Sequence, residues 1–322
     1  MAYSKEFITD IYKNLLSMRL SEEKLVTIYK EGRVPGHIHS GVGQEATHVG
    51  TLFTRKEGDY FKLAHRLVSI SHVLGVPFNN IFAEILGRQD GNSRGGGGVN
   101  HIADFSKGVL GMSGTLGCDA AVACGAAYKI KLSGADNIAY CFYGDGTSNR
   151  GPVHEAMNLA AAWKLPVLFV LDNNQWAIST CIHESCAVEN PGGDRAAAYG
   201  MEARVVDGTD VLAVYEAAKE LTDYVRAGNG PAILEAKNYR WRGHFEGDQC
   251  KYRDPAITEK WEKKRDGVKK MENFMLENDF ITKEEIEQAY LDIDVELNAA
   301  VDFAEASPRA TAEDLYPMIY AD

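Results

Sequence analysis

Two short polar tracts carry residue types that could hold a metal ion and a phosphate. The first, YGDGTSNR at 143–150, places Asp145 between two glycines, and the second, NNQW at 173–176, begins with paired asparagines. Carboxylate and amide oxygens are hard ligands that suit Mg²⁺ or Ca²⁺, and Mg²⁺ commonly shares phosphate oxygens with its protein ligands. Glycines let the backbone approach a diphosphate closely. The tracts therefore predict a cation and a phosphorylated cofactor near Asp145 and Asn174.

Either tract taken alone is more typical of a plain turn, because Gly, Asp and Asn all favour turns. Their joint placement is more specific, since Asp145 and Asn174 are 29 positions apart and each follows an apolar run. No GxxxxGK[ST] motif occurs. The glycine-rich segment 87–117 offers no GxGxxG between a strand and a helix, and such a loop is expected to wrap around something. ATPase and dinucleotide-binding interpretations are therefore less favoured.

The elements that must position these tracts predict an α/β fold. The expected strands are 138–143, 167–171, 205–206 and 232–235, and the expected helices are 120–131, 152–163 and 211–224. A strand-helix-strand unit implies parallel pairing, and ligands of open parallel sheets bind outside the carboxyl ends of the strands. We therefore expect a doubly wound, mostly parallel sheet with helices on both faces, and Asp145 and Asn174 as neighbours at one end of it.

Helical patterns flank this sheet at both ends of the chain. Apolar residues at spacings near three and four predict one or two amphipathic helices over about 4–29, and the charged chain from Pro255 onward is also helical in pattern. No internal repeat is visible. We expect a single domain over residues 1–322, with a helical N-terminal arm at about 1–31 and a helical C-terminal segment at about 255–322.

Composition limits the classes of function. With 322 residues, 45% of them hydrophobic, the chain has room for a large core. The net charge of -12 disfavours non-specific binding to nucleic acid, although a net value does not exclude a local basic patch. The sequence contains neither a signal-peptide core nor eighteen consecutive apolar residues, so we expect a cytoplasmic protein without a membrane partner. Six cysteines without a CxxC pair are expected to be reduced.

Tracts spread over nearly the whole chain point to one family. They are GHIHSGVGQEA at 36–46, AHRLVS at 64–69, RGGGGVNHI at 94–102, MSGTLG at 112–117, the run from GDG to NN at 144–174, RAAAYGMEARVVDG at 195–208 and YRWRGHFEGD at 239–248. The GDG and NN tracts at this separation resemble the thiamine diphosphate signature. Together, the tracts resemble the α subunits of the two-chain E1 components of 2-oxo acid and acetoin dehydrogenases.

This resemblance implies a site for thiamine diphosphate and Mg²⁺. Asp145 and Asn174 would bind Mg²⁺ through their side chains, and Trp176 would bind it through its backbone carbonyl. Many relatives have Tyr at that position, and the exchange of rings should be harmless because only the carbonyl coordinates. Gly146 and Thr147 would donate backbone amides to the diphosphate.

The resemblance also implies contacts from other parts of the chain. Arg66 would make a charge-assisted contact with the diphosphate, with a plain surface arginine as the alternative. His65, which stands where Tyr is common in the family, would also contact the diphosphate. Gly114 would meet the aminopyrimidine through its backbone, and Leu116 would wedge the cofactor into its bent conformation. A plain core role for Leu116 is the alternative.

Three histidines fall in the matching tracts. A single histidine is more often structural than catalytic, but His244 and His39 match active-site positions of the family. Imidazole suits proton transfer near neutral pH. We therefore expect His244 and His39 to be catalytic, with His244 also in contact with the cofactor, and His101 to lie behind them.

The implied activity is cleavage of a C–C bond next to a carbonyl. The two-carbon unit would pass to a lipoyl group on an acyltransferase (E2), and dihydrolipoyl dehydrogenase (E3) would reoxidise that lipoyl group. The tract GHFEGD looks more like the acetoin branch, because pyruvate and branched-chain relatives usually have Ser after the histidine. Pyruvate or another 2-oxo acid is the alternative substrate. Half of a split transketolase and a non-catalytic Mg-phosphate binding module are alternatives from other classes, although tract 239–248 argues against the transketolase.

The family also implies that this chain is incomplete alone. The glutamate that activates the aminopyrimidine belongs to a second, pyrimidine-binding domain, and the sequence leaves no second sheet pattern for it. A β subunit in an α₂β₂ heterotetramer would supply that domain. Glu45, in GQEA, is the internal candidate for this glutamate, but its place at a helix entrance is the interpretation that we favour.

Overall fold

The computed structural model describes residues 3–319, so the outermost residues of the two expected arms lie outside it. It contains a five-stranded sheet in the order β1-β2-β3-β7-β6 with every neighbouring pair parallel. Its strands are β1 Tyr60–Lys62, β2 Ala139–Gly144, β3 Val167–Asn173, β6 Glu202–Asp207 and β7 Ala232–Lys237. The predicted α/β fold class, with a parallel sheet between helices, is confirmed.

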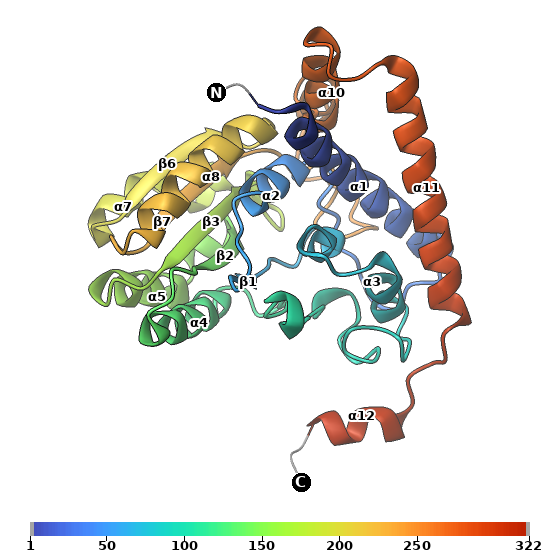
Figure 1. Ribbon diagram of the computed structural model, residues 1–322, viewed down its shortest axis with the longest axis horizontal. Helices are drawn as coiled ribbons and strands as arrows, with labels where there is room; N and C mark the ends of the chain where they lie inside the picture. Colours follow the sequence, from blue (N-terminus) through green and yellow to red (C-terminus); the bar gives the residue numbers. More distant parts are fainter. Residues whose placement is uncertain (1–2, 320–322) are drawn as a thin grey trace.

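Helices cover both faces of the sheet (Figure 1). They are α1 Lys5–Lys30, α2 Glu45–Leu52, α3 Phe78–Ile85, α4 Asp119–Ser133, α5 Gly151–Ala162, α6 Ile182–Ser185, α7 Gly193–Tyr199, α8 Val211–Arg226, α9 Pro255–Lys264, α10 Gly267–Glu277, α11 Lys283–Ala306 and α12 Ala312–Ile319. The smaller elements are the 3₁₀ turns η1 Val68–Leu74, η2 Gly98–Asn100, η3 Phe105–Lys107 and η4 Thr147–Asn149, and a two-stranded ribbon of β4 Trp176–Ala177 and β5 Thr180–Cys181.

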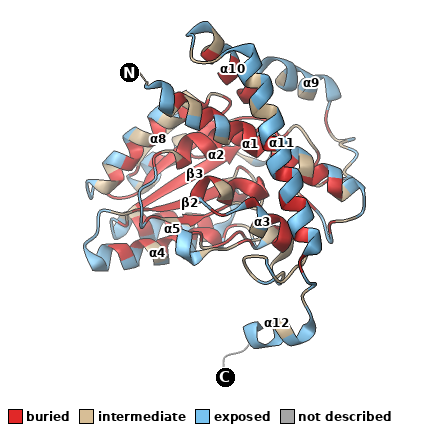
Figure 2. Cartoon of the chain, turned by 45° about the vertical axis from the view of Figure 1, so that its right-hand side comes forward, coloured by how far each residue is buried: buried red, intermediate tan, exposed pale blue. Residues whose placement is uncertain are grey.

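The central strands divide the core into two layers because successive side chains of a strand point to opposite faces. Tyr140 and Phe142 of β2 join the core beneath α1, α2 and α8. Cys141 and Tyr143 join the core beneath α4 and α5. Figure 2 shows these strands as buried, and within β2 only Gly144 at its end is partly exposed. Burial on both faces explains why β2 and β3 read as continuous apolar runs.

The N-terminal arm is one helix rather than two. Ser4 caps α1 by accepting a hydrogen bond from the Phe7 amide at 3.2 Å. The helix then packs against α2, α10 and α11, so that it lies beside two helices from the C-terminal part of the sequence (Figure 1). Thr282 and Glu285 form a capping box at the start of α11, with bonds of 2.8 and 3.2 Å. No helix within 3–319 is long and apolar enough to cross a membrane.

Candidate active site

A cavity of about 200 Å³ opens at the carboxyl ends of β2 and β3. These strands pair in register, with Gly144 opposite Asp172, so the residues that follow each strand share one edge of the sheet. The predicted site residues that line the cavity are His65, Arg66, Leu116, Asp145, Gly146, Thr147, Asn174, Trp176 and His244. The interpretation of the GDG and NN tracts as neighbours is therefore confirmed.

Asp145 is a buried carboxylate without a full set of partners. Its side chain is 3% exposed, and Oδ2 has no hydrogen-bond partner within the described residues. Burial and then the neighbouring carboxylate of Asp172 raise the pKa of Asp145 to about 7. A cation beside Oδ2 would offset both effects, because it favours the ionised form of a carboxyl group. The residue therefore fits a metal ligand.

The paired asparagines at the end of β3 have different roles. Asn173 points into the protein and donates to Glu235 Oε1 at 2.6 Å. Asn174 lines the cavity, donates to Gln44 Oε1 at 3.2 Å, and accepts from the Trp176 amide at 3.2 Å. Between them and Trp176, Gln175 adopts a left-handed φ of 71° that turns the chain over the cavity. The second asparagine is thus the one available to a ligand.

The ribbon that follows this turn packs closely on the GDG turn. A Cβ atom on Gly146 would lie 2.4 Å from the Cβ of Ala177, so only glycine fits there. Arg240, which is fully buried, holds the ribbon by donating to the carbonyls of Ile178 at 2.7 Å and Trp176 at 3.5 Å. Trp176 itself lines the cavity, so its position is compatible with the predicted backbone ligand.

Arg66 joins two loops beneath the cavity. It donates to the Ser40 carbonyl at 3.0 Å and to the His244 carbonyl at 2.9 Å, and one of its amino groups lies 3.2 Å from His244 Nδ1. Burial and then the charge of Arg240 lower the pKa of the Arg66 guanidinium to about 9. A nearby anion would counter this effect. Arg66 is therefore a buried cation, and the alternative of a plain surface arginine is wrong.

Three imidazoles cluster against Arg66. The ring of His39 lies with its centroid 5.0 Å from that of His65 and 4.9 Å from that of His244. Burial and the charge of Arg66 lower the pKa of His39 and of His244 to about 4 each, and hold that of His65 well below its ordinary value. All three rings are therefore neutral near pH 7. Nδ1 of His39 and of His65 is buried without a partner among the described residues.

Three expected site residues lie away from the cavity lining. His39 reaches the site only through its neighbouring rings. His101 is exposed, with Nδ1 3.3 Å from the Met112 carbonyl. Gly114 is exposed in the loop before α4, and no atom lies within 4 Å of where its Cβ would stand. The chain therefore does not by itself place Gly114 against a ligand in this cavity.

Glu45 is buried, and its carboxylate is bonded to other parts of the protein. It begins α2, is 1% exposed, and pairs with Arg19 Nε at 2.6 Å. The Gly43 amide donates to its carboxylate at 3.0 Å. It does not belong to the residues that line the cavity. These contacts agree with a place at a helix entrance and leave no carboxylate oxygen directed at a cofactor in the cavity.

Several polar residues of the site were not predicted from the sequence, and four of them bear on its geometry. Asp172 and Asp119 line the cavity, and Arg240 supports the ribbon. Asn238 follows β7 and donates to Asp172 Oδ1 at 2.6 Å, which fixes that carboxylate beneath the cavity. Asp172 and Asn238 could have been found from the sequence, because each ends or follows an apolar strand in the same way as Asp145. Asp119 had no such signal.

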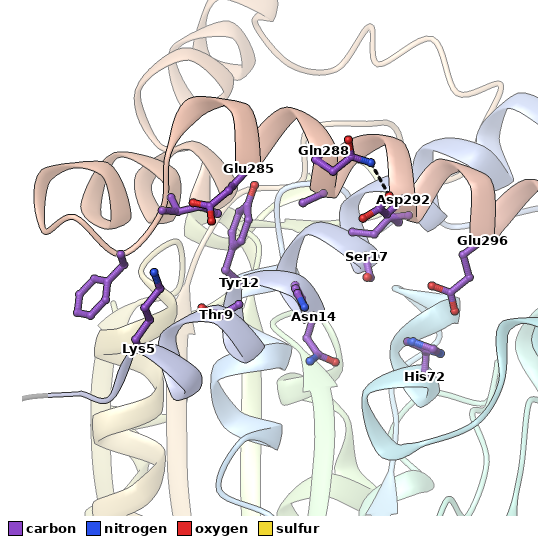
Figure 3. Close-up of a pocket in the computed structure, with 15 residues that line it drawn as sticks. Lys5, Thr9, Tyr12, Asn14, Ser17, His72, Glu285, Gln288, Asp292 and Glu296 are labelled. Carbon is purple, nitrogen blue, oxygen red and sulfur yellow. Dashed lines mark hydrogen bonds between the residues drawn. The ribbon is translucent and has the colours of Figure 1, made fainter.

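A second, larger cleft lies apart from these residues. It has a volume of about 540 Å³ and runs between α1 and α11 (Figure 3). Lys5, Glu285 and Asp292 face it, and Gln288 donates to Asp292 at 2.7 Å. It shares no lining residue with the cavity at the sheet and contains none of the predicted site residues.

Comparison with known proteins agrees with this geometry. The sequence model of the family described as "Dehydrogenase E1 component" matches residues 12–313. The chain is 37% identical to the α subunit of acetoin:2,6-dichlorophenolindophenol oxidoreductase from Bacillus subtilis, over 96% of this chain and 92% of the relative. The corresponding subunit from Cupriavidus necator is also 37% identical, over 98% and 95%.

A pyruvate dehydrogenase is also similar. The α subunit of the pyruvate dehydrogenase E1 component from Rhizobium meliloti is 33% identical, over 98% of this chain and 91% of the relative. Both kinds of relative are α subunits, which implies a second kind of subunit beside them. The chain therefore belongs to the dehydrogenase E1 component family, whose members depend on thiamine diphosphate, and it is an α subunit of such an oxidoreductase.

Proposed function

We propose that this chain binds the diphosphate half of thiamine diphosphate together with Mg²⁺ and, joined to a β subunit, cleaves acetoin. The observation that carries the proposal is the buried Asp145 carboxylate, whose Oδ2 has no partner in the described part of the chain and which lines a cavity together with Asn174. Mg²⁺ prefers such oxygen ligands and shares its remaining positions with phosphate and water. Asp145 and Asn174 would bind the ion through side chains, and Trp176 would bind it through its carbonyl.

The diphosphate would lie against the GDG turn and Arg66. Gly146 and Thr147 line the cavity, and their backbone amides are the proposed donors to the diphosphate oxygens. Arg66 supplies a positive charge, and the residue is only 6% exposed, so water screens its attraction for an anion weakly. His65 is a neutral neighbour that can donate or accept one hydrogen bond at each ring nitrogen.

When bound, thiamine diphosphate supplies the carbon that attacks a substrate carbonyl and takes up the electrons of the broken C–C bond. This chain contributes binding and proton transfer. His244 and His39 are held neutral near pH 7, so each ring can donate a hydrogen bond from one nitrogen and accept one at the other. His244 lines the cavity and is the proposed partner of the substrate oxygen, with His39 behind it.

Acetoin is the proposed substrate because both relatives at 37% identity are named for it and because GHFEGD has Phe rather than Ser after the histidine. We further propose an α₂β₂ assembly that passes the two-carbon unit to a lipoyl-bearing acyltransferase, which dihydrolipoyl dehydrogenase reoxidises. The relatives named as pyruvate dehydrogenases make pyruvate the competing substrate.

Steady-state activity of the co-expressed α and β subunits on acetoin and on pyruvate, with a dye as electron acceptor, tests this proposal. We expect kcat/KM to be at least about tenfold higher for acetoin, a difference of about 1.4 kcal/mol in transition-state stabilisation. Asp145→Asn should abolish turnover, whereas Asp136→Asn, which alters an exposed aspartate on the loop before β2, should not. A preference for pyruvate would reassign the substrate, and turnover by Asp145→Asn would refute the metal site.

A further inference from the structure

Lys62, the last residue of β1, is a buried cation close to the cofactor cavity. Its side chain is 5% exposed, and Nζ lies 2.8 Å from Asp119 Oδ1. The same Nζ donates to the Gly111 carbonyl at 2.8 Å. Asp119 is the first residue of α4 and lines the cavity. Lys62 therefore binds both ends of the loop that runs from Gly111 to Asp119.

That loop has few other attachments. Before it, segment 108–110 is fixed along β1, because the Phe61 amide donates to the Gly108 carbonyl at 2.8 Å and the Leu110 amide donates to the Phe61 carbonyl at 2.9 Å. Within the described residues, the backbone of 113–117 makes no hydrogen bond to another helix or strand. Leu116, in the middle of this stretch, nevertheless lines the cavity.

We propose that Lys62 and Asp119 are positioning residues that hold loop 111–119 at the aminopyrimidine end of the cofactor site. This inference rests on the proposed function, in which Leu116 wedges the cofactor and Gly114 meets the aminopyrimidine. Neither partner of the pair is a catalytic residue. A buried pair is costly to desolvate and is weak evidence for stability, so a role in positioning gives it a physical purpose that packing alone does not.

The proposal predicts that the two ends of the cofactor respond differently. The diphosphate end depends on Asp145 and the GDG turn, which Lys62 does not touch. The aminopyrimidine end depends on the loop. Loss of the pair should therefore weaken binding of intact thiamine diphosphate while leaving the binding of magnesium pyrophosphate, which occupies only the diphosphate end, unchanged.

The test uses calorimetric titration of the assembled α and β subunits with each ligand. The informative variant is Lys62→Met/Asp119→Leu, because it replaces both charges of the pair. Lys62→Met alone would leave the Asp119 carboxylate buried without a partner. We expect its affinity for thiamine diphosphate to fall about 10- to 100-fold, as a displaced positioning group typically causes, and its affinity for magnesium pyrophosphate to change by less than about twofold. The control Lys56→Met/Asp136→Leu removes an exposed pair at 2.8 Å and should change neither affinity.

The outcomes separate the two proposals. Unchanged affinity for thiamine diphosphate in the double variant, or a parallel loss of both ligands, would overturn the positioning role of Lys62 and Asp119. Failure of the unaltered assembly to bind magnesium pyrophosphate would instead refute the proposed function on which the inference rests. A thermal unfolding midpoint of the double variant close to that of the unaltered protein confirms that the comparison is between folded proteins.

Discussion

Replacing the Asp145 carboxylate should weaken cofactor binding but stabilise the protein without cofactor. Asp145→Asn keeps the shape of the side chain but removes the charge that a cation needs. Since even the outer partners of metal ligands change metal affinity about 10- to 100-fold, we expect at least that loss in affinity for Mg²⁺ and thiamine diphosphate. Without cofactor, the substitution should raise the free energy of unfolding by about 1–2 kcal/mol, because it removes a buried charge whose Oδ2 has no partner within residues 3–319.

Calorimetric titration and urea unfolding measure these two effects on the same variant. Asn174→Ala is expected to lower the affinity without the gain in apo stability, because it removes an amide that already bonds to Gln44 and Trp176. An Asp145→Asn protein that is less stable without cofactor and binds it normally would show that this carboxylate serves the fold and not a metal.

The imidazoles of His39 and His244 should make stability depend on pH. In the unfolded chain a histidine takes up a proton below about pH 6.5. In the folded protein the pKa of both is lowered to about 4 by burial and by Arg66. Between these two pH values the unfolded state binds more protons than the folded state. The two residues therefore make their full contribution to the free energy of unfolding above pH 6.5, and that contribution falls as the pH is lowered toward 4.

The unfolding free energy at pH 7.5 and pH 5 of the unaltered chain and of His39→Asn/His244→Asn tests this sign. The variant should lose less stability on acidification than the unaltered chain. The difference between the two proteins is the informative quantity, because Glu22, whose pKa burial raises to about 7, contributes in the opposite direction to both. Equal losses would mean that these rings are not held neutral by the fold.

At the scale of elements, the glycine-rich loop folds around a side chain of the protein itself. Glu84 of α3 is fully buried, and its carboxylate accepts four backbone amides, from Ser93, Gly95, Gly97 and Gly98, at 2.7 to 3.1 Å. Such a concave set of amides is typical of an anion-binding nest. The expectation that the glycine-rich segment wraps around something is thus confirmed for residues 93–98, and the anion at their centre is a carboxylate rather than a phosphate.

Glu84→Gln should loosen this loop selectively. The amide side chain keeps one acceptor oxygen and directs an NH₂ group at backbone donors, so about 1–3 kcal/mol of stability should be lost. Hydrogen exchange of the amides in 93–98 should become at least about tenfold faster, since 1.4 kcal/mol of local stability corresponds to that factor. Glu277→Gln, at an exposed helix end, is the matched control. Unchanged exchange in 93–98 would show that the loop does not depend on the carboxylate.

Sequence patterns predicted the central elements well and the supporting contacts poorly. Strand β2 lies within one residue of its predicted range, and β3 extends two residues beyond its own, because burial on both faces gives a continuous apolar run. Only two residues of β6 were predicted, since its six residues include none that is buried. Strand β1 was not predicted at all, because it has three residues and ends in a lysine.

The site shows the same difference between residues that could be predicted from the sequence and residues that could not. Residues that follow strands, such as Asp145 and Asn174, could be placed from the sequence because parallel strands end at a common edge. The roles of Glu84, Lys62 and Asp119 could not, because each depends on a partner brought close by the tertiary fold. Asp119, for example, pairs with a lysine 57 positions earlier in the chain.

At the scale of the whole molecule, the cavity has an edge that this chain leaves open. The sheet and its two layers hold the diphosphate side, whereas Gly114 is exposed and Glu45 is bound to Arg19. The relatives are α subunits, which implies a partner subunit, and we propose that this β subunit supplies the side that would activate the aminopyrimidine. We therefore predict that activity belongs to the assembly.

Acetoin-dependent dye reduction by the purified chain, before and after addition of its β subunit, tests this claim most directly. With saturating Mg²⁺ and thiamine diphosphate, we expect no turnover from the chain alone, and full turnover together with tight cofactor binding once the β subunit is present. Full activity from the isolated chain that is lost on Glu45→Gln would contradict the account, because it would mean that one chain carries the complete site.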